Sequence, residues 1–314
     1  MNQFLSINDV PNPAQLVHEA LALKADPFSY AHLGKHKTLG LLFLNPSLRT
    51  RMSTQRAAQN LGMDVMVLNM DKDSWKLEFE DGSVMDGAGQ EHVKEAAAVI
   101  SQYCDIVGIR TFPSLENRNE DYSEMILKKF VKYARVPVIS LESATLHPLQ
   151  SLADWITIEE HKKKKLPKVV LTWVPHPKAL PQSVPNSFVQ WLKEAPVELV
   201  IAHPGGYELS IEFTAGVVIE NDQNKALEKA DFVYAKNWSS YSDYGKILSE
   251  NNSWMITPEK MALTNQAGFM HCLPVRRNVV VSDEVIDGQG SLVIQQAENR
   301  IYASQAVLKA LLEK

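Results

Sequence analysis

Cysteine is scarce in this chain of 314 residues, which has only Cys104 and Cys272. The two are far apart in sequence and lie in apolar surroundings, which favours a reduced compartment over a disulfide scaffold. No apolar run reaches the roughly 20 residues that a membrane-spanning helix needs. Residues 1–5 also lack the basic and apolar regions of a secretion signal. We therefore expect a soluble cytoplasmic protein with no membrane partner.

Positive charge is not in excess either. The formal net charge is -5, and the sequence pI is about 6.0. This balance argues against a nucleic-acid partner, so we expect the arginines to serve a small anion. Hydrophobic residues make up 45% and charged residues 22%, which is typical of a globular chain with a real core. The length is sufficient for two domains.

Several common site motifs are missing. Gly87-Ala88-Gly89 lacks a third glycine and does not directly follow a strand, so it is no dinucleotide fingerprint. There is no Walker loop, and no histidine and cysteine spacing fits a structural zinc site. Cys272 is adjacent to His271, but neighbouring residues on a strand point to opposite faces, which argues against a thiol–imidazole pair.

The chain alternates between buried strand patterns and amphipathic helix patterns. This alternation predicts an α/β fold with parallel sheets, and a break near residue 150 predicts two doubly wound domains. We interpret the basic run at 162–165 as a solvated linker. The expected strands are 38–44, 64–70, 105–109, 137–140, 168–174, 198–202, 231–235 and 268–272. The expected helices are 12–24, 52–61, 91–103, 122–133, 149–160, 184–193, 222–229 and 303–312, with residues 74–90 irregular.

The segment 45–51 lies where a strand ends and a helix begins. It carries two hydroxyls, Ser47 and Thr50, and two arginines, Arg49 and Arg51. A helix N-terminus presents N–H groups and a partial positive charge, so this composition suits a phosphate. The alternative is a serine that caps the helix, with solvated arginines around it.

Other polar residues also follow predicted strands. Ligands of open α/β sheets bind beyond the carboxyl ends of the strands. Each of these residues has an ordinary explanation alone, but together they predict a cleft between two domains that is lined with cations and hydroxyls. They are Arg110, His147, His176, Lys236, His271 and Arg276.

Three motifs carry a resemblance to a known family. Residues 47–51, Ser-Leu-Arg-Thr-Arg, resemble the Ser-x-Arg-Thr-Arg signature of the aspartate/ornithine carbamoyltransferases. Residues 147–150, His-Pro-Leu-Gln, together with Asp154 resemble the family's His-Pro-x-Gln…Asp motif. Residues 271–274, His-Cys-Leu-Pro, resemble the corresponding motif of the ornithine branch. The motifs occur in the family's order, and the likeness covers nearly the whole chain.

The resemblance implies a fold, an assembly and a reaction. The fold would be two α/β domains joined by two helices. Residues 1–150 would bind carbamoyl phosphate, with a C-terminal helix at about 296–314 packing back on them, and residues 151–295 would bind an acylornithine. The family assembles as a homotrimer with shared active sites. It moves the carbamoyl group of carbamoyl phosphate to an amine, without a metal or an organic cofactor.

The resemblance also implies roles for the matching residues. Thr50, Arg110 and His147 would stabilise the negative carbonyl oxygen, Gln150 would hold the carbamoyl NH2 group, and Cys272 would join the catalytic set. The leaving phosphate would accept the proton of the amine, so that no strong general base is needed. The implied carbamoyl phosphate site is Ser47, Leu48, Arg49, Thr50, Trp75, Arg110, His147, Pro148, Leu149, Gln150, Cys272, Leu273 and Arg300.

The second substrate site departs from the ordinary ornithine pattern. Lys236 occupies the place of an aspartate that serves the free α-amino group of ornithine, and the family's Ser-Met-Gly loop is missing. A lysine repels an α-ammonium group but attracts an α-carboxylate. These departures, with Trp75 in a polar loop, resemble the N-acylornithine branch, in which a neighbouring subunit donates such a tryptophan. The implied acylornithine residues are Glu142, His176, Lys236, Arg276 and Gln90.

The identity of the acyl group is inferred mainly from position 90, with support from position 280. In the acetyl-specific members the loop around residue 90 carries a glutamate, and in the succinyl-specific members it carries a proline, whereas this chain has Gln90. Glutamate repels a succinyl carboxylate, but glutamine does not. The acetyl branch also has a modified lysine where this chain has Val280. We expect N-succinyl-L-ornithine as the acceptor and N-succinyl-L-citrulline and phosphate as products, in arginine biosynthesis. The alternatives are an N-acetyl-L-ornithine enzyme and a non-catalytic module that binds a phosphate metabolite.

Overall fold

The computed structural model describes residues 1–70, 72–248 and 251–313. The chain divides into two compact units. The first comprises Met1–Pro113, Asn119–Leu149 and the residues from Arg300 onward. The second comprises Ser114–Arg118 and Gln150–Asn299. The chain passes from one unit to the other within helix α6 (Pro148–His161) and within helix α12 (Val293–Leu312).

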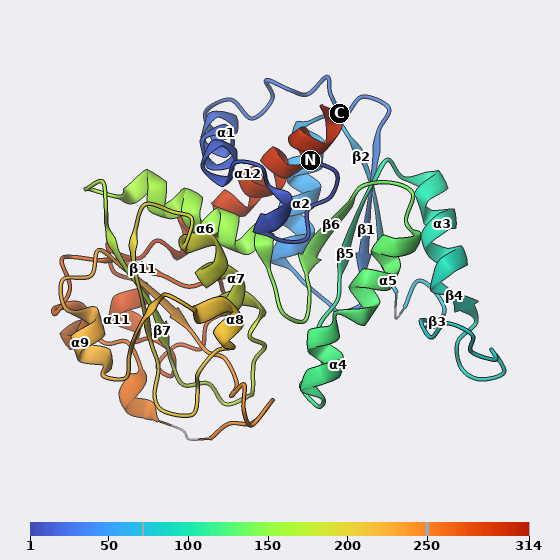
Figure 1. The fold of residues 1–314 in the computed structure, drawn as a ribbon. Coiled ribbons are helices and arrows are strands. Elements are labelled where there is room, and N and C mark those ends of the chain that lie inside the picture. The colour runs from blue at the N-terminus through green and yellow to red at the C-terminus, as the bar shows by residue number, and fades with distance from the viewer. Residues whose placement is uncertain (71, 249–250, 314) are drawn as a thin grey trace. The chain divides into compact units, whose positions relative to one another are not determined.

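The first unit contains a parallel four-stranded sheet in the order β2-β1-β5-β6 (Figure 1). Its central strand is an apolar run in which five of six residues are buried. Gly40 is required there, because a Cβ at this position would lie 2.6 Å from the Cys104 sulfur. The elements are β1 (Thr38–Phe43), β2 (Asp64–Asn69), β5 (Ile106–Arg110), β6 (Val138–Glu142), η1 (Ile7–Asp9), α1 (Pro13–Ala25), α2 (Arg49–Asn60), α3 (Val93–Tyr103), α4 (Arg118–Ser123) and α5 (Met125–Tyr133).

The core of this unit lies between the sheet and two helices. Leu42, Val107 and Ile109 of the sheet pack with Ala97 of α3 and Phe130 of α5. Burial of this apolar surface is the main favourable contribution to folding.

The second unit contains a parallel five-stranded sheet in the order β11-β10-β7-β8-β9. Its core is aromatic. The Trp173 ring lies 4.5 Å from that of Tyr207, and its Nε1 donates to the carbonyl of Trp238 at 3.0 Å. Besides α6 and α12, the elements are β7 (Lys168–Trp173), β8 (Glu198–Ala202), β9 (Val218–Glu220), β10 (Phe232–Lys236), β11 (Gly268–Met270), α7 (Ser183–Leu192), α8 (Ile211–Thr214), α9 (Gln223–Leu227), η2 (Asn252–Trp254), α10 (Pro258–Met261) and α11 (Asp283–Ile286). The predicted α/β class with two parallel sheets is confirmed.

The helix predicted at 122–133 is wrong as a single element. It is divided into α4 and α5 at Glu124, whose φ is 53°, in the left-handed region. Few residues other than glycine adopt this conformation, so a break there needs compensation. The compensation comes from hydrogen bonds of the Glu124 carboxylate, which are described below.

The last helix begins earlier than its apolar pattern predicts. α12 starts at Val293, whereas the pattern begins at 303. Its first turns bury Gln296, Asn299 and Arg300, which interrupt the apolar pattern. Position 314, the end of the predicted C-terminal helix, lies outside the described residues.

The irregular segment 74–90 is closed by one short parallel ladder, which joins a strand near its start to a strand directly after its end. β3 (Leu77–Glu78) pairs with β4 (Glu91–His92). Strand β9 was not predicted, and its Val218 and Ile219 are exposed at the edge of the second sheet. Across the part of the chain that the structure describes, no helix combines the length and the apolar character needed to cross a membrane.

Candidate active site

Candidate residues of each unit follow strands at a point where the strand order reverses. In the first sheet this point lies between β1 and β5, and Phe43 at the end of β1 is in register with Arg110 at the end of β5. In the second sheet it lies between β7 and β10, where Trp173 is in register with Lys236. Ligands of α/β sheets bind outside the carboxyl ends of strands at such reversals.

In the first unit, the N-terminus of α2 has no serine cap. The cap residue is Leu48, whose aliphatic side chain cannot accept a hydrogen bond, so the alternative of a capping Ser47 is wrong. Ser47 and Arg49 are half-buried, and Thr50 is buried. Arg51 has a different role from the one expected, since it donates to Asn69 Oδ1 at 2.7 Å. The remaining groups and the helix N-terminus suit an anion.

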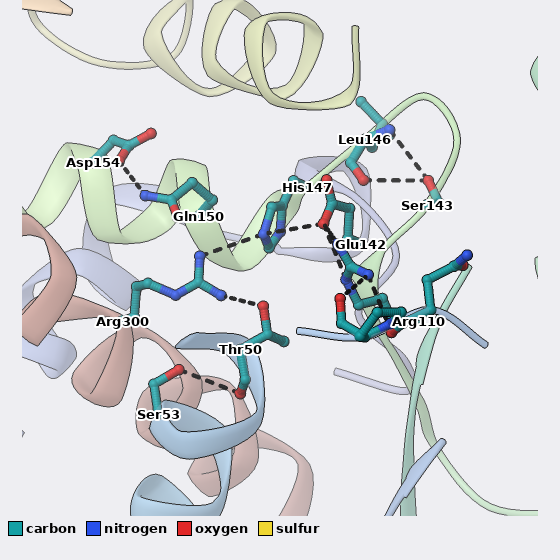
Figure 2. Close-up of polar contacts among 12 residues, drawn as sticks. Thr50, Ser53, Arg110, Glu142, Ser143, Leu146, His147, Gln150, Asp154 and Arg300 are labelled. Carbon is teal, nitrogen blue, oxygen red and sulfur yellow. Dashed lines mark hydrogen bonds and ion pairs between the residues drawn. The ribbon is translucent and has the colours of Figure 1, made fainter. Parts of the chain in front are cut away.

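Arg300 joins Thr50 to His147. One of its terminal nitrogens donates to Thr50 Oγ1 at 2.6 Å, and the other lies 3.3 Å from His147 Nε2. Figure 2 shows the Arg300 guanidinium between these two side chains. All three are buried. The C-terminal helix therefore supplies a fixed positive charge to the first turn of α2.

His147 is held neutral. Burial, followed by the charges of Arg300, Arg110 and Arg49, lowers its pKa to about 3, although Glu142 opposes the shift. A neutral imidazole that accepts from Arg300 at Nε2 carries its proton on Nδ1. Nδ1 is buried, with no hydrogen-bond partner among the described residues. His147 thus presents an N–H donor without a positive charge.

Arg110 is anchored by four hydrogen bonds. Its Nε and one terminal nitrogen donate to Glu142 Oε2 at 3.2 and 2.7 Å. Its other terminal nitrogen donates to the carbonyls of Asn45 and Pro46 at 3.2 and 3.1 Å. These bonds occupy four of the five N–H groups of a guanidinium. The anchoring therefore fixes Arg110 against the 45–51 segment and leaves one N–H for a ligand.

Glu142 belongs to this first unit, whereas the other residues predicted to bind the acyl substrate, apart from Gln90, belong to the second. Its Oε2 lies 3.9 Å from His147 Nε2 as well as accepting from Arg110. Its contacts in the structure thus serve to orient catalytic candidates.

The loop that leads into His147 is held by Glu124. The Oε1 atom of Glu124 accepts from Ser143 Oγ at 2.6 Å, from Thr145 N at 2.7 Å and from Thr145 Oγ1 at 2.5 Å. Charge-assisted bonds of this kind are about twice as strong as neutral ones. They explain why the helix breaks at Glu124. Sequence reasoning missed this residue, which has no motif of its own.

The segment 74–90 presents Trp75 and Gln90 outward. Trp75 is 51% exposed, and its Nε1 donates to Glu91 Oε2 at 2.7 Å. Gln90 is exposed, and its backbone N–H donates to the carbonyl of Lys76. Neither residue belongs to the buried cluster around His147.

In the second unit, His176 lies in a cationic group. Burial and the charges of Lys236, Arg276 and Lys178 lower its pKa, against a hydrogen bond with the Lys178 backbone. Lys236 is buried at the end of β10 and donates to the carbonyl of Asn237 at 2.9 Å. The excess of positive charge suits a carboxylate ligand.

Arg277, which lies three residues after the His-Cys-Leu-Pro motif, forms ion pairs with two aspartates. It makes two bonds to Asp287, at 2.6 and 2.7 Å, and one to Asp283 at 2.9 Å. These carboxylates hold its pKa well above its usual range.

The His-Cys-Leu-Pro residues follow β11. His271 is buried, and its Nδ1 accepts from Leu273 N at 2.9 Å. Cys272 is half-buried, and Leu273 has a φ of 55°. Pro148 and Leu149 form the first turn of α6, and Gln150 in the same turn donates to Asp154 at 2.7 Å (Figure 2). Within residues 1–70, 72–248 and 251–313, no cluster of three or more histidine, cysteine or acidic side chains could hold a metal ion.

The first unit has a helix N-terminus that suits a phosphate, and the second unit has a cationic group that suits a carboxylate. Together with the two parallel sheets, these features define the class of protein. The chain belongs to the aspartate/ornithine carbamoyltransferase family. Residues 2–160 match the family's carbamoyl phosphate-binding domain, and residues 181–311 match its aspartate/ornithine-binding domain.

Particular relatives are also similar over most or all of their length. The chain is 51% identical to N-succinylornithine carbamoyltransferase of Bacteroides thetaiotaomicron, across 100% of this chain and 99% of the relative. It is 36% identical to N-acetylornithine carbamoyltransferase of Xanthomonas axonopodis pv. citri, across 93% and 92%. A crystal structure of an N-acetyl-L-ornithine transcarbamylase mutant, with alanine in place of a glutamate and in complex with carbamyl phosphate and N-succinyl-L-norvaline, superposes with a TM-score of 0.93. Its sequence identity is 34%, and the match covers 99% of this chain and 100% of that one.

Proposed function

We propose that this protein transfers the carbamoyl group of carbamoyl phosphate to the side-chain amine of N-succinyl-L-ornithine. The products would be N-succinyl-L-citrulline and phosphate, in arginine biosynthesis. The observation that carries the proposal is the 51% identity, over the whole chain, to an N-succinylornithine carbamoyltransferase. The identity to the acetylornithine relative is lower, at 36%.

The first unit would bind carbamoyl phosphate. Its phosphate would lie at the N-terminus of α2, where Ser47, the Leu48 N–H, Arg49 and Thr50 offer donors. The electrostatic partners of His147 are three arginines and one glutamate, a net positive surrounding that suits a phosphate dianion. Arg300 would hold Thr50 in place, since the two side chains are 2.6 Å apart.

The carbonyl oxygen would be stabilised by donors that are already fixed. As the amine attacks, this oxygen gains negative charge, and preorganised donors lower the barrier. The Nδ1–H of His147, the remaining N–H of Arg110 and the Thr50 hydroxyl are suited to this role. With a pKa of about 3, His147 would act as a neutral donor and not as a general acid. The departing phosphate would take up the proton of the amine.

The second unit would bind the acylornithine. His176, Lys236 and Arg276 form a cationic group that suits an α-carboxylate. The same charges would repel a free α-ammonium, which favours a substrate whose α-amino group is acylated. Because Arg277 is paired with Asp283 and Asp287, Lys178 or Lys76 would meet the succinyl carboxylate instead.

Gln90 would set the choice of acyl group. It is neutral and exposed, so it would tolerate the extra carboxylate of a succinyl group. Gln90→Glu would shift the preference toward N-acetyl-L-ornithine by tenfold or more, because a second carboxylate would face the first. Gln90→Met keeps the backbone N–H bond to Lys76 and a side chain of similar length, so it is the matched neutral control and would retain succinyl preference.

We also propose a cytoplasmic homotrimer with shared active sites, in which Trp75 serves the site of a neighbouring chain. The support is the half-exposed indole of Trp75, whose ring is available beyond its own chain. Sedimentation velocity would test the oligomeric state.

The deciding experiment is carbamoyl phosphate-dependent product formation with N-succinylornithine, N-acetylornithine and ornithine side by side. A large preference for N-succinylornithine supports the proposal. Preference for N-acetylornithine would contradict the role proposed for Gln90, since the glutamine would then select the acyl group as a glutamate does. Exclusive use of ornithine would overturn the role of Lys236. Binding of carbamoyl phosphate in calorimetry without any turnover would identify a non-catalytic module.

A further inference from the structure

The segment 74–92, called the arm below, is closed by its own short ladder. β3 pairs with β4, and the Gln90 N–H donates to the carbonyl of Lys76 at 2.9 Å. The Nε1 atom of Trp75 donates to Glu91 Oε2 at 2.7 Å. In Figure 1 the arm is the loop that projects past β3 and β4. Three residues assigned above to the substrates, Trp75, Lys76 and Gln90, therefore depend on the position of this ladder.

Two side chains of α5 hold the arm just beyond β3. Lys129 Nζ donates to the carbonyl of Phe79 and lies 3.6 Å from Asp81 Oδ2. One turn further along α5, the Tyr133 hydroxyl donates to Asp81 Oδ1 at 3.0 Å. Positions i and i+4 lie on one face of a helix, which explains why both side chains reach the same carboxylate. Asp81 is thus held through both of its oxygens.

The contact between α5 and the arm is partly shielded from water. The Lys129 side chain is 18% exposed, and that of Asp81 is 46% exposed. The hydrogen bond from Tyr133 is the largest cause that lowers the pKa of Asp81, and the charge of Lys129 adds to it, although desolvation opposes both. Asp81 is therefore a carboxylate at neutral pH, and hydrogen bonds to a charged acceptor are stronger than neutral ones.

We propose that Lys129 and Tyr133 are positioning residues, which fix the arm through Asp81 and thereby increase the selectivity for the acyl group. This inference rests on the proposed function, because it assumes that the arm meets the acylornithine. All the residues that carry it belong to the first unit.

The physical reason is the cost of ordering the arm. If the arm is already held against α5, the substrate does not have to immobilise it on binding. Without these contacts, the neutral Gln90 and the cation Lys76 would still be present, but part of the binding free energy would be spent on ordering them. The loss would be greater for a succinyl group than for an acetyl group, because only the succinyl group has a carboxylate for the arm to recognise.

Two substitutions release the arm with little change in packing. Tyr133→Phe removes the hydroxyl but keeps the ring, which also lies 5.6 Å from Lys94 Nζ and 5.0 Å from Lys132 Nζ. Lys129→Met removes the ammonium group and keeps a long side chain. For each variant we expect the ratio of kcat/KM for N-succinylornithine to that for N-acetylornithine to fall at least threefold. The fall should come from KM, with kcat within about twofold of the wild type.

A double-mutant cycle tests whether the two α5 residues act through Asp81. Tyr133→Phe loses one printed contact, the bond to Asp81, so it has nothing further to remove once that carboxylate is absent. Asp81→Ala should lower the selectivity at least as much as Tyr133→Phe, and the double variant should lose no more than Asp81→Ala alone. Additive losses would overturn the proposed route through Asp81.

The first unit offers a matched control. Lys37 also forms an ion pair with an aspartate, Asp105, at 2.8 Å, and both residues lie outside the arm. Lys37→Met should leave the ratio of the two acyl substrates unchanged. An equal fall in Lys37→Met and Lys129→Met would mean that any lost ion pair of this unit has the same effect, which would overturn the proposal.

Hydrogen exchange tests the anchoring without any substrate. Amides of the arm should exchange at least threefold faster in Tyr133→Phe and Lys129→Met than in the wild type, and Lys37→Met should not change them. Unchanged exchange in the first two variants would overturn the proposal. A wild type that transfers no carbamoyl group would refute the proposed function and, with it, the role in selectivity. An active wild type whose selectivity survives both substitutions would refute only this inference.

Discussion

The neutral state of His147 makes folding stability depend on pH in a way that one substitution can isolate. The imidazole has an ordinary pKa of 6.5, which the folded protein lowers to about 3. The unfolded chain therefore binds a proton between these two values and the folded chain does not. The contribution of His147 to stability is complete above pH 6.5 and is lost progressively as the pH falls toward 3.

The magnitude follows from the pKa difference. Each pH unit below 6.5 costs about 1.4 kcal/mol until the folded pKa is reached. At pH 5 the loss is about 2 kcal/mol relative to pH 8. For a unit of 150 to 250 residues this corresponds to about 4 to 8 °C in Tm.

The perturbation is His147→Gln, whose amide oxygen can still accept from Arg300 but does not titrate. Thermal and urea unfolding of both proteins would be measured from pH 8 to pH 5. The stability of the wild type relative to the variant should fall by about 2 kcal/mol over this range. Parallel curves would refute the reasoning, because they would mean that His147 has the same pKa in both states. Histidine NMR titration of the wild type would report the same pKa directly.

Four other predictions concern single substitutions at three residues. Arg110→Lys should lower kcat at least tenfold with the fold intact, as judged by circular dichroism, because lysine keeps the charge opposite Glu142 but lacks the fork of donors. Arg110→Ala should also lose at least tenfold in kcat, and it should be less stable than the lysine variant because Glu142 is left buried and unpaired. Glu124→Ala should lower the free energy of unfolding by about 2 kcal/mol, measured in urea, because it removes charge-assisted bonds to the loop before His147. Trp75→Ala should leave Tm nearly unchanged and raise the KM for carbamoyl phosphate. Mixing it with Arg110→Ala chains after partial unfolding should restore activity if sites are shared, and no recovery would place Trp75 within its own site.

Local patterns predicted most of the fold. The run at Thr38–Phe43 is apolar on both faces, and only a strand covered on both sides fits it. Strands β5, β7, β8 and β10 were found in the same way, and the ends of β5 and β10 located the candidate residues Arg110 and Lys236.

Contacts between distant residues could not be predicted. The helix break at Glu124 depends on bonds to residues 19 to 21 positions further along the chain. The apolar pattern missed the start of α12, which the family resemblance put near residue 296, because Gln296 and Asn299 look like solvent-facing residues. Their partners, Asp154 and Thr157, are each 142 positions away.

The same limit applies within the candidate site. The sequence placed Arg51 with the anion-binding residues, yet its guanidinium binds Asn69 and lies over the Phe43 ring, 5.3 Å from its centroid. Glu142 stays a predicted contact of the acyl substrate, and the structure adds an ion pair with Arg110 and an approach to His147 that its residue type did not indicate. Residue type and order identify which groups a site has available, but the direction of each side chain depends on its tertiary partners.

The carboxylate of Glu124 has a consequence for protein engineering. The loop 143–146 is held by bonds between its own Ser143 and Leu146, and also by Glu124, which lies between α4 and α5 and binds the backbone and hydroxyls of the loop. The His-Pro-Leu-Gln segment would therefore not keep its conformation if it were transplanted alone. A transplant into another scaffold, or a chimera that exchanges residues 138–161 alone, would need a carboxylate at the equivalent place. Without one, the graft would contain the same residues, but the loop before the histidine would not keep its conformation.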